Sequence, residues 1–188
     1  MILTSIFAVG FSSSAVSGER QRGYLEVVLA RPISRRALYG TLAAAAFSFV
    51  ALSVTALLTG GLAGSTLAGV IGELAIVHVP LLWLNAFLLF ASFAAIGLAA
   101  SVSFDRLPPA LGVTIGIVVT MYTIDVVGSL WPRAAFLQPY SLFHYLKARA
   151  ILTGAAEPRD LVVLAAVIGA AIGWAIIVFP RRNLAAPS

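Results

Sequence analysis

Few residues of this 188-residue chain have the chemistry of a catalytic or metal-binding site. The chain has no cysteine, which excludes disulfides, thiolate metal ligands and cysteine nucleophiles together. Its two histidines, His78 and His144, are far apart in the sequence, and neither has a carboxylate at the spacing of a metal site. The Gly-x-Ser-x-Gly motif of serine hydrolases does not occur. We therefore expect no catalytic residue, metal or cofactor in this chain.

A phosphate-binding loop is also missing, because no Gly-x-x-x-x-Gly-Lys-Ser/Thr sequence occurs. The glycine-rich piece at residues 60–64, Gly-Gly-Leu-Ala-Gly, lacks the lysine and follows an apolar segment. We predict a turn there. The chain cannot bind ATP by this route, so any use of ATP requires another subunit.

Two polar residues, Asp125 and Asn85, interrupt apolar segments and are candidates for a polar pathway through a membrane. An acid near the bilayer centre costs about 2.5–3.5 kcal/mol, which favours a function or a cationic partner for Asp125. However, five residues separate it from Leu130, about 7.5 Å along a helix, so it can also reach headgroup water. Both interpretations of Asp125 stay open.

The composition places the chain in a membrane. Apolar residues make up 61% and charged residues 10%, and the mean hydropathy is +1.03. A soluble protein of this size could not hide so much hydrocarbon, and disorder requires low hydrophobicity. The net charge of +5 comes from residues between apolar runs. It therefore indicates membrane orientation and a lipid environment, and no nucleic-acid partner.

Five apolar segments have the character of membrane-spanning helices when they are read in windows of about 20 residues. The fourth opens with Pro108-Pro109, in the first turn where proline is tolerated. We predict one all-α domain over residues 1–188, a polytopic transmembrane helical bundle. Its spans lie near residues 2–17, 37–59, 74–100, 107–130 and 161–179.

The first of these segments, residues 2–17, is short and rich in serine. It can be a secretory signal peptide with Ala15-Val16-Ser17 as the cleavage site, although no Lys or Arg precedes the apolar stretch. It can also be a marginal span that lines a polar interior. A third interpretation is that Met1 lies inside a longer natural chain with another span upstream.

Lysines and arginines predict the orientation, because they gather in cytoplasmic loops. The connection 18–36 holds five of them, the connection 101–106 one and the C-terminal tail two. On the opposite side, the connection 60–73 holds none and the connection 131–160 holds four. The side that includes the C-terminal tail thus holds eight basic residues and the opposite side holds four, which predicts a cytoplasmic C-terminus. Because the chain has five predicted spans, the N-terminus then lies outside.

Two of the connections have a pattern of their own. The pattern of residues 18–32 predicts an amphipathic helix on the membrane surface, because the apolar side chains of Tyr24, Leu25 and Val28 share one side of it. Pro32 ends this helix. Residues 138–152 interleave aromatic and basic side chains, which favour the headgroup layer. We predict a short interfacial or re-entrant helix there, on the external side.

Pairs of glycines four residues apart occur in the middle of two spans. They are Gly112 with Gly116 and Gly169 with Gly173. Such spacing lets two helices approach closely, so we predict helix packing at these positions.

Residues 18–35 read GERQRGYLEVVLARPISR, and this segment resembles the cytoplasmic segment of type-2 ABC transporter permeases. Tyr24 replaces the usual Thr, and the Lys that often follows is absent. The matching residues are Glu19, Gly23, Leu25, Glu26, Pro32, Ile33, Ser34 and Arg35.

Two further motifs extend the resemblance over nearly the whole chain, from the family's second span to its sixth. Residues 138–140, Gln-Pro-Tyr, and 152–154, Leu-Thr-Gly, are similar to the family's external Ser-Pro-Phe element and its helix. Residues 179–184 are similar to its closing Phe-x-Arg-Arg-Asp-Leu, with Asn183 for Asp.

The resemblance implies the permease subunit of an ABC exporter in the cell membrane. In the family, two permeases assemble as a homo- or heterodimer with two ATPase subunits, which bind the ATP. The surface helix between the family's second and third spans docks into the ATPase. The residues to which the resemblance gives this coupling role are Glu19, Gly23, Leu25, Glu26, Pro32 and Arg35.

Two other classes of function remain as alternatives. One is a non-transporting membrane scaffold or accessory protein, for example a truncated permease. The other is an intramembrane enzyme that uses Asp125 and a histidine, and the lack of paired polar residues within the spans argues against it. An ATPase partner distinguishes the permease from both.

Overall fold

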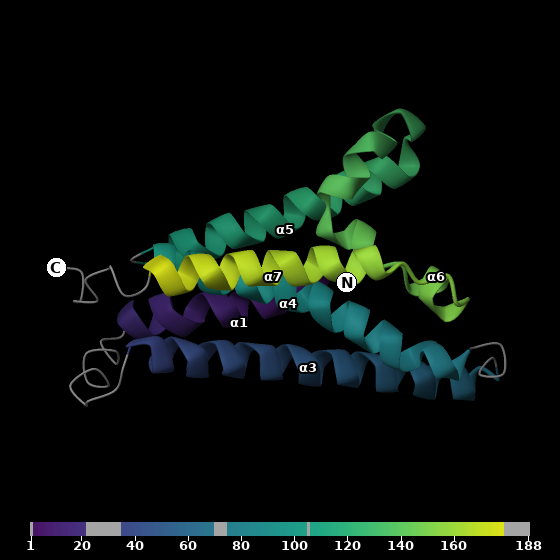
Figure 1. The fold of residues 1–188 in the computed structure, drawn as a ribbon, viewed down its shortest axis with the longest axis horizontal. Helices are drawn as coiled ribbons and strands as arrows, with labels where there is room; N and C mark the ends of the chain where they lie inside the picture. The colour runs from purple at the N-terminus through teal and green to yellow at the C-terminus, as the bar shows by residue number, and fades with distance from the viewer. Residues whose placement is uncertain (1, 22–34, 70–74, 105, 179–188) are drawn as a thin grey trace.

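The computed structural model describes residues 2–21, 35–69, 75–104 and 106–178, and all their regular elements are helices. The long helices are α1 (Ile2–Gln21), α3 (Arg35–Leu67), α4 (Val79–Ser103), α5 (Leu107–Leu130) and α7 (Pro158–Val178). The short ones are η2 (Ile76–His78), η3 (Pro132–Tyr140), η4 (Leu142–Tyr145) and α6 (Ala148–Leu152). The predicted all-α helical bundle is confirmed (Figure 1).

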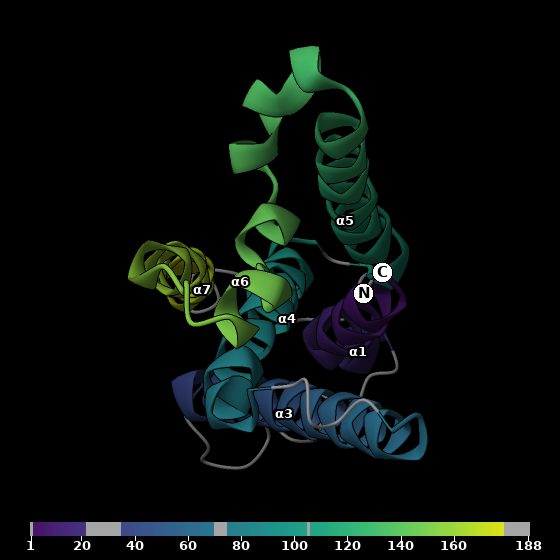
Figure 2. The ribbon, with the colours of Figure 1, turned by 90° about the vertical axis from the view of Figure 1, so that its right-hand side faces the viewer.

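Helix α4 is the centre of the bundle. It packs against α1, α3, α5 and α7, and against η2, η4 and α6 as well. Viewed along the bundle, the other long helices surround it (Figure 2). In its most apolar window 61% of the residues are buried inside the protein, against 22% or less in the corresponding windows of α3, α5 and α7. Most of the apolar surface of those three helices is therefore left for lipid or for other chains.

Small residues on α4 allow this close approach. A Cβ added at Gly97 would lie 3.1 Å from Ser13 Oγ and 3.2 Å from Ser12 Cβ, both on α1. Ser12 is fully buried, and its hydroxyl donates to the Ala8 carbonyl one turn earlier at 2.6 Å. Two of the serines that make residues 2–17 look marginal in the sequence, Ser12 and Ser13, therefore lie against α4, where small side chains fit.

Hydrogen bonds between side chains and neighbouring helices join α4 to α7 at two levels. In the middle of the bundle, Ser92 Oγ donates to the Leu164 carbonyl at 3.2 Å. Near the end of α4, Trp174 Nε1 donates to Ser103 Oγ at 3.2 Å. Bonds of this kind contribute to helix association in lipid, where apolar surfaces alone give little preference for a particular neighbour.

The long helices alternate in direction, which gives the bundle two distinct ends (Figure 1). Helices α1, α4 and α7 finish, and α3 and α5 begin, at one end, which we call the Arg35 end. The opposite end, which we call the Lys147 end, carries η2, η3, η4 and α6 together with the start of α7. The connections that the sequence assigns to opposite sides of the membrane thus leave from opposite ends.

Four helices among the described residues are long and apolar enough to cross a membrane. They are Tyr39–Leu67, Ile76–Ser103, Leu107–Leu130 and Pro158–Val178. The first predicted segment is also helical, within the 20-residue helix α1, and its apolar part among the described side chains is Ile2–Ser13. The chain is a multi-pass membrane protein.

The turn predicted at residues 60–64 is wrong, because α3 continues through these glycines to Leu67. A glycine costs a helix about 1 kcal/mol relative to alanine in water. In lipid, however, a helix satisfies its own backbone hydrogen bonds, whereas an open turn leaves them unmet. The left-handed residue that ends this segment is Gly69, with φ of 72°.

The single external helix predicted over residues 138–152 is also wrong, because the segment is broken into η3, η4 and α6. The breaks fall at Ser141, whose backbone is extended with φ of −94° and ψ of 133°, and at Leu146 and Lys147, whose ψ values of 81° and 63° are not helical. Ser141 then caps η4 by accepting from the Phe143 N–H at 3.2 Å. Its hydroxyl also donates to the Met121 carbonyl at 2.7 Å, which holds η4 against α5.

The contact of Gly97 with α1 gives a first prediction. Gly97→Leu should destabilise the purified chain in detergent by about 1–3 kcal/mol, because the larger side chain overfills the space beside Ser12 and Ser13. Thermal unfolding measures the effect. Gly60→Leu is the matched control, since a Cβ at Gly60 meets no atom within 4 Å, and it should not destabilise. Equal losses in the two variants would contradict the prediction.

Candidate functional site

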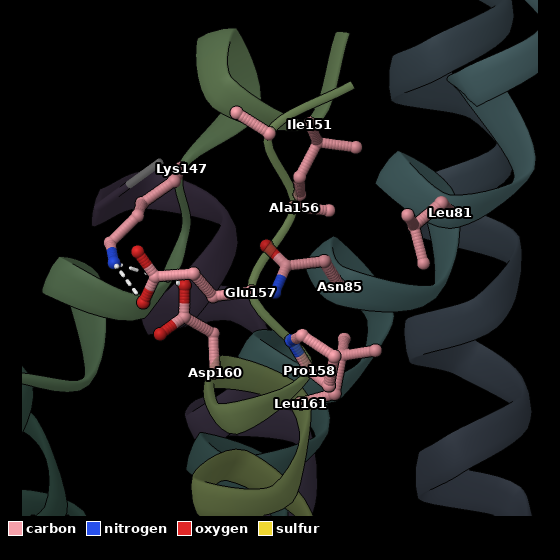
Figure 3. Close-up of a pocket in the computed structure, with 10 residues that line it drawn as sticks. Leu81, Asn85, Lys147, Ile151, Ala156, Glu157, Pro158, Asp160 and Leu161 are labelled. Atoms are coloured by element: carbon pink, nitrogen blue, oxygen red, sulfur yellow. Dashed lines mark hydrogen bonds and ion pairs between the residues drawn. The ribbon is translucent and has the colours of Figure 1, made fainter. Parts of the chain in front are cut away.

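A charged cluster lies at the Lys147 end, between the segment that follows η4 and the start of α7. Lys147 Nζ lies 3.2 Å from Asp160 Oδ2 and 3.3 Å from Glu157 Oε2 (Figure 3). The side chain of Asp160 is 7% exposed, that of Lys147 30% and that of Glu157 60%. The buried member of the cluster is therefore Asp160, and Lys147 is the cation that compensates it.

Local sequence places the two carboxylates. Pro158 begins α7, and Asp160 follows in its first turn, where the exposed N–H groups of a helix favour a negative charge. The Asp160 N–H donates to the Glu157 carbonyl at 3.1 Å. The chain returns from α6 through Gly154, whose φ of 82° suits glycine, and a Cβ there would lie 3.6 Å from the His78 ring.

The cluster holds Lys147 in its charged form. Partial burial opposes the charge, but the hydrogen bonds to Asp160 and Glu157 outweigh burial, and the pKa of Lys147 is raised above its ordinary value of 10.5. The ammonium is thus present at every physiological pH. It ties the segment between η4 and α7 to the first turn of α7.

A cavity of about 170 Å³ lies next to this cluster, among α4, α6 and α7 (Figure 3). Most of its wall is aliphatic, from Leu81, Ile151, Leu161 and neighbouring alanines, and Lys147, Glu157 and Asp160 line its charged side. Asn85 of α4 also lines it and is 1% exposed. The cavity therefore combines an apolar interior with a few polar groups, as small-molecule sites do.

Of the two polar atoms of the Asn85 amide, only the nitrogen has a hydrogen-bond partner. Its Nδ2 donates to the Tyr145 carbonyl at 3.1 Å, whereas its Oδ1 is buried and has no partner. Because a carbonyl can only accept, this bond also fixes which end of the amide is the nitrogen. Asn85 thus brings one unmet, buried acceptor to the wall of the cavity.

The sequence singles out Asn85 and Asp125 as polar pathway residues, and the structure does not bring them together. Asn85 lines the cavity, whereas Asp125 is half-buried on α5 and is not part of the cavity wall. The location of Asp125 close to the end of α5 agrees with the interpretation that it reaches the headgroup layer.

Sequence reasoning missed the charged cluster. It treats Lys147 as an interfacial cation and gives no role to Glu157 or Asp160. A signal was available in the order Glu-Pro-Arg-Asp at residues 157–160, directly before an apolar span. Acidic residues beside a proline are typical of a helix start, where exposed N–H groups favour negative charge, so this order indicates where α7 begins but not which cation pairs with Asp160.

Among the residues that the structure describes, the four glycines predicted to pack helices closely face no neighbouring helix. A Cβ added at Gly112, Gly116, Gly169 or Gly173 would meet no atom within 4 Å. Among the described residues, close contacts are made instead by Gly97, against α1, and by Gly128, where an added Cβ would meet the Gln138 side chain of η3, and both lie outside the two Gly-x-x-x-Gly pairs. The surfaces around the four glycines are open to lipid or to another chain.

The residues with a predicted coupling role belong to the Arg35 end or lie outside the described residues. The backbone of Glu19 is in the last turn of α1, and that of Arg35 begins α3. Gly23, Leu25, Glu26 and Pro32 lie outside the described residues. The predicted coupling helix is therefore untested beyond Gln21, up to which α1 continues without a break.

Comparison with known families identifies the chain. The family model described as "ABC-2 family transporter protein" matches residues 1–184. The chain therefore belongs to the ABC-2 transporter family. Members of this family are membrane components of transporters, are not themselves catalytic, and typically work with an ATPase subunit. No curated protein and no solved structure matches the chain.

The buried carboxylate of Asp160 gives a second prediction. Lys147→Met should destabilise the chain by about 1–3 kcal/mol in thermal or denaturant unfolding, because it leaves that carboxylate without its cation. Glu157→Gln is the control and should cost about 1 kcal/mol or less, since Glu157 is exposed. Adding Asp160→Leu to Lys147→Met should restore part of the loss. Equal costs for the two single variants would refute this account.

The raised pKa of Lys147 gives a third prediction, for alkaline pH. A base whose pKa is higher in the folded chain contributes stability below its unfolded pKa, and this contribution is lost as the pH rises through the folded value. The free energy of unfolding should thus fall above about pH 10.5 more steeply in the natural chain than in Lys147→Met. Parallel curves for the two proteins would contradict it.

Proposed function

We propose that this chain is the permease subunit of an ATP-driven ABC exporter in the cell membrane. The observation that carries the proposal is the family match over residues 1–184, on a bundle with four helices long enough to span a membrane. The sequence has no phosphate-binding loop, so ATP is bound and hydrolysed by a separate ATPase subunit.

In this proposal the Arg35 end faces the cytoplasm and receives the ATPase. Two arguments support this orientation. The five arginines of residues 18–36 lie along the chain from the last turn of α1 to the first turn of α3, and Arg106 stands before α5. Cytoplasmic loops are enriched in such residues, and α7 also finishes at this end, which gives a cytoplasmic C-terminus.

The path of coupling follows from the packing. ATP-driven closure of the ATPase pair would push the segment around Gly23 and Glu26, which connects α1 to α3. Helix α1 packs tightly on α4 at Gly97, so a tilt of α1 moves α4. The other half of α4 carries Asn85 and the cavity, at the opposite end of the bundle. A movement of α1 at the Arg35 end would thereby shift the part of α4 that lines the cavity at the Lys147 end.

A second permease copy completes the transporter in this proposal. The four glycines of the two Gly-x-x-x-Gly pairs support a close approach of another helix, because a Cβ added at any of them on α5 or α7 would meet no atom of the described residues within 4 Å. Much of α7 is apolar and exposed, including Val162, Trp174 and Ile177. A copy of the same chain and a related permease serve this role equally well.

The orientation is tested by single-cysteine labelling, which needs no prior removal of cysteines because the chain has none. Gln21→Cys, at the Arg35 end, should react with a membrane-impermeant maleimide only after intact cells are permeabilised. Thr66→Cys, exposed near the finish of α3, should react without permeabilisation. The reverse pattern would overturn the proposed side for the ATPase.

The coupling role is tested with the complete transporter in proteoliposomes. Glu26→Ala and Gly23→Leu should each reduce transport-coupled ATP hydrolysis by about tenfold, within the usual range of coupling between two sites. Glu73→Ala is the matched control, an acidic residue in the connection at the other end, and it should leave the rate unchanged. Unchanged hydrolysis in all three variants, with the ATPase still bound, would argue for the scaffold alternative.

A further inference from the structure

We propose that the cavity beside Asn85 binds a small amphiphile through its protonated primary amine, which donates a hydrogen bond to Asn85 Oδ1. The cavity lies at the Lys147 end, away from the proposed ATPase contact. Binding there requires no ATPase, so the inference and the proposed function can fail independently.

The first support is the unmet acceptor. Asn85 is 1% exposed, and its Oδ1 has no partner although its Nδ2 donates to the Tyr145 carbonyl. A buried polar atom without a partner is costly, and native proteins rarely leave one in place. The carboxamide is fixed by the bond to Tyr145 and lines the cavity, so a guest in the cavity can supply the missing donor.

The second support is the shape and lining of the cavity. Its volume is about 170 Å³, similar to cavities of roughly 150 Å³ that hold a benzene molecule. Leu81, Ile151 and Leu161 give it aliphatic walls. A buried water needs two to four polar partners, and these walls offer none over most of the volume. An apolar body of about six carbon atoms fits this space better than a group of waters.

The third support is the charge along one side. Asp160 and Glu157 carry two negative charges, and Lys147 supplies one positive charge against them. The charged groups that line the cavity therefore have a net charge of about −1, which favours a cationic guest over an anionic one. A protonated amine meets both requirements, because it carries a positive charge and can only donate hydrogen bonds.

The experiment uses the full chain in phosphatidylcholine nanodiscs and isothermal titration with hexylammonium chloride, 1-hexanol and sodium hexanoate. These three probes share the six-carbon body and differ in charge and donor. Hexylammonium should bind about tenfold or more tightly than hexanol, because hydrogen bonds to charged groups are stronger. Hexanoate should not bind. Absence of hexylammonium binding, or equal binding of all three probes, would overturn the proposal.

Two variants assign the binding to this cavity. Asn85→Leu removes the acceptor at nearly the same size and should weaken hexylammonium binding about tenfold. Ala156→Leu keeps Asn85 and fills the cavity, so it should abolish binding even if Asn85→Leu fails to fold. Ser103→Ala is the matched control, a polar position of α4 at the Arg35 end, and it should bind as the natural chain does. Unchanged binding in Asn85→Leu and Ala156→Leu would refute the assignment.

The amine can come from a free amphiphile or from a lipid headgroup. Repeating the titration in nanodiscs that contain phosphatidylethanolamine separates these sources. A lipid amine in the cavity should weaken the apparent affinity for hexylammonium, whereas a site for free amines should keep the affinity measured in phosphatidylcholine.

Discussion

Close packing around α4 is the constraint on which the rest of the bundle depends. Lipid gives two apolar helices little reason to associate, so they must fit well and approach closely. Helix α4 meets this requirement with small residues, among them Ala91, Ala94 and Gly97, and it contacts all four other long helices. Helices α3, α5 and α7 bury much less of themselves than α4, and α1 packs on α5 and α3 as well as on α4.

Polar side chains then select particular neighbours along this central helix. Trp83 donates to Thr55 Oγ1 of α3 at 3.0 Å, and Ser92 donates to the Leu164 carbonyl of α7 at 3.2 Å. Asn85 completes only one of its bonds in the same way, to the Tyr145 carbonyl. The unmet acceptor of Asn85 lies beside the cavity, and this is why we propose that a ligand binds there.

The sequence predicts the membrane bundle well, because long apolar segments in lipid have few alternatives to a helix. It also picks out Asn85 from its apolar surroundings. It fails at residues 60–64, where glycines that signal a turn in water continue α3, because lipid favours a helix that satisfies its own backbone hydrogen bonds. The cluster of Lys147 and Asp160 needs the fold, because thirteen positions separate the two residues and nothing local shows that they meet. The coupling residues from Gly23 to Pro32 stay predictions.

The unbroken length of α3 has a consequence for the lipid around the protein. Its apolar part, Tyr39–Leu67, has 29 residues, which extend about 43 Å as a helix, whereas the hydrocarbon of a typical bilayer is about 30 Å thick. Such a mismatch is relieved by inclining the helix or by locally thickening the bilayer. Because α3 is joined to α4 by the bond from Trp83, the inclination of one helix constrains the other. A change in membrane thickness would therefore change the inclination of α3 and, through it, that of α4 at the centre of the bundle.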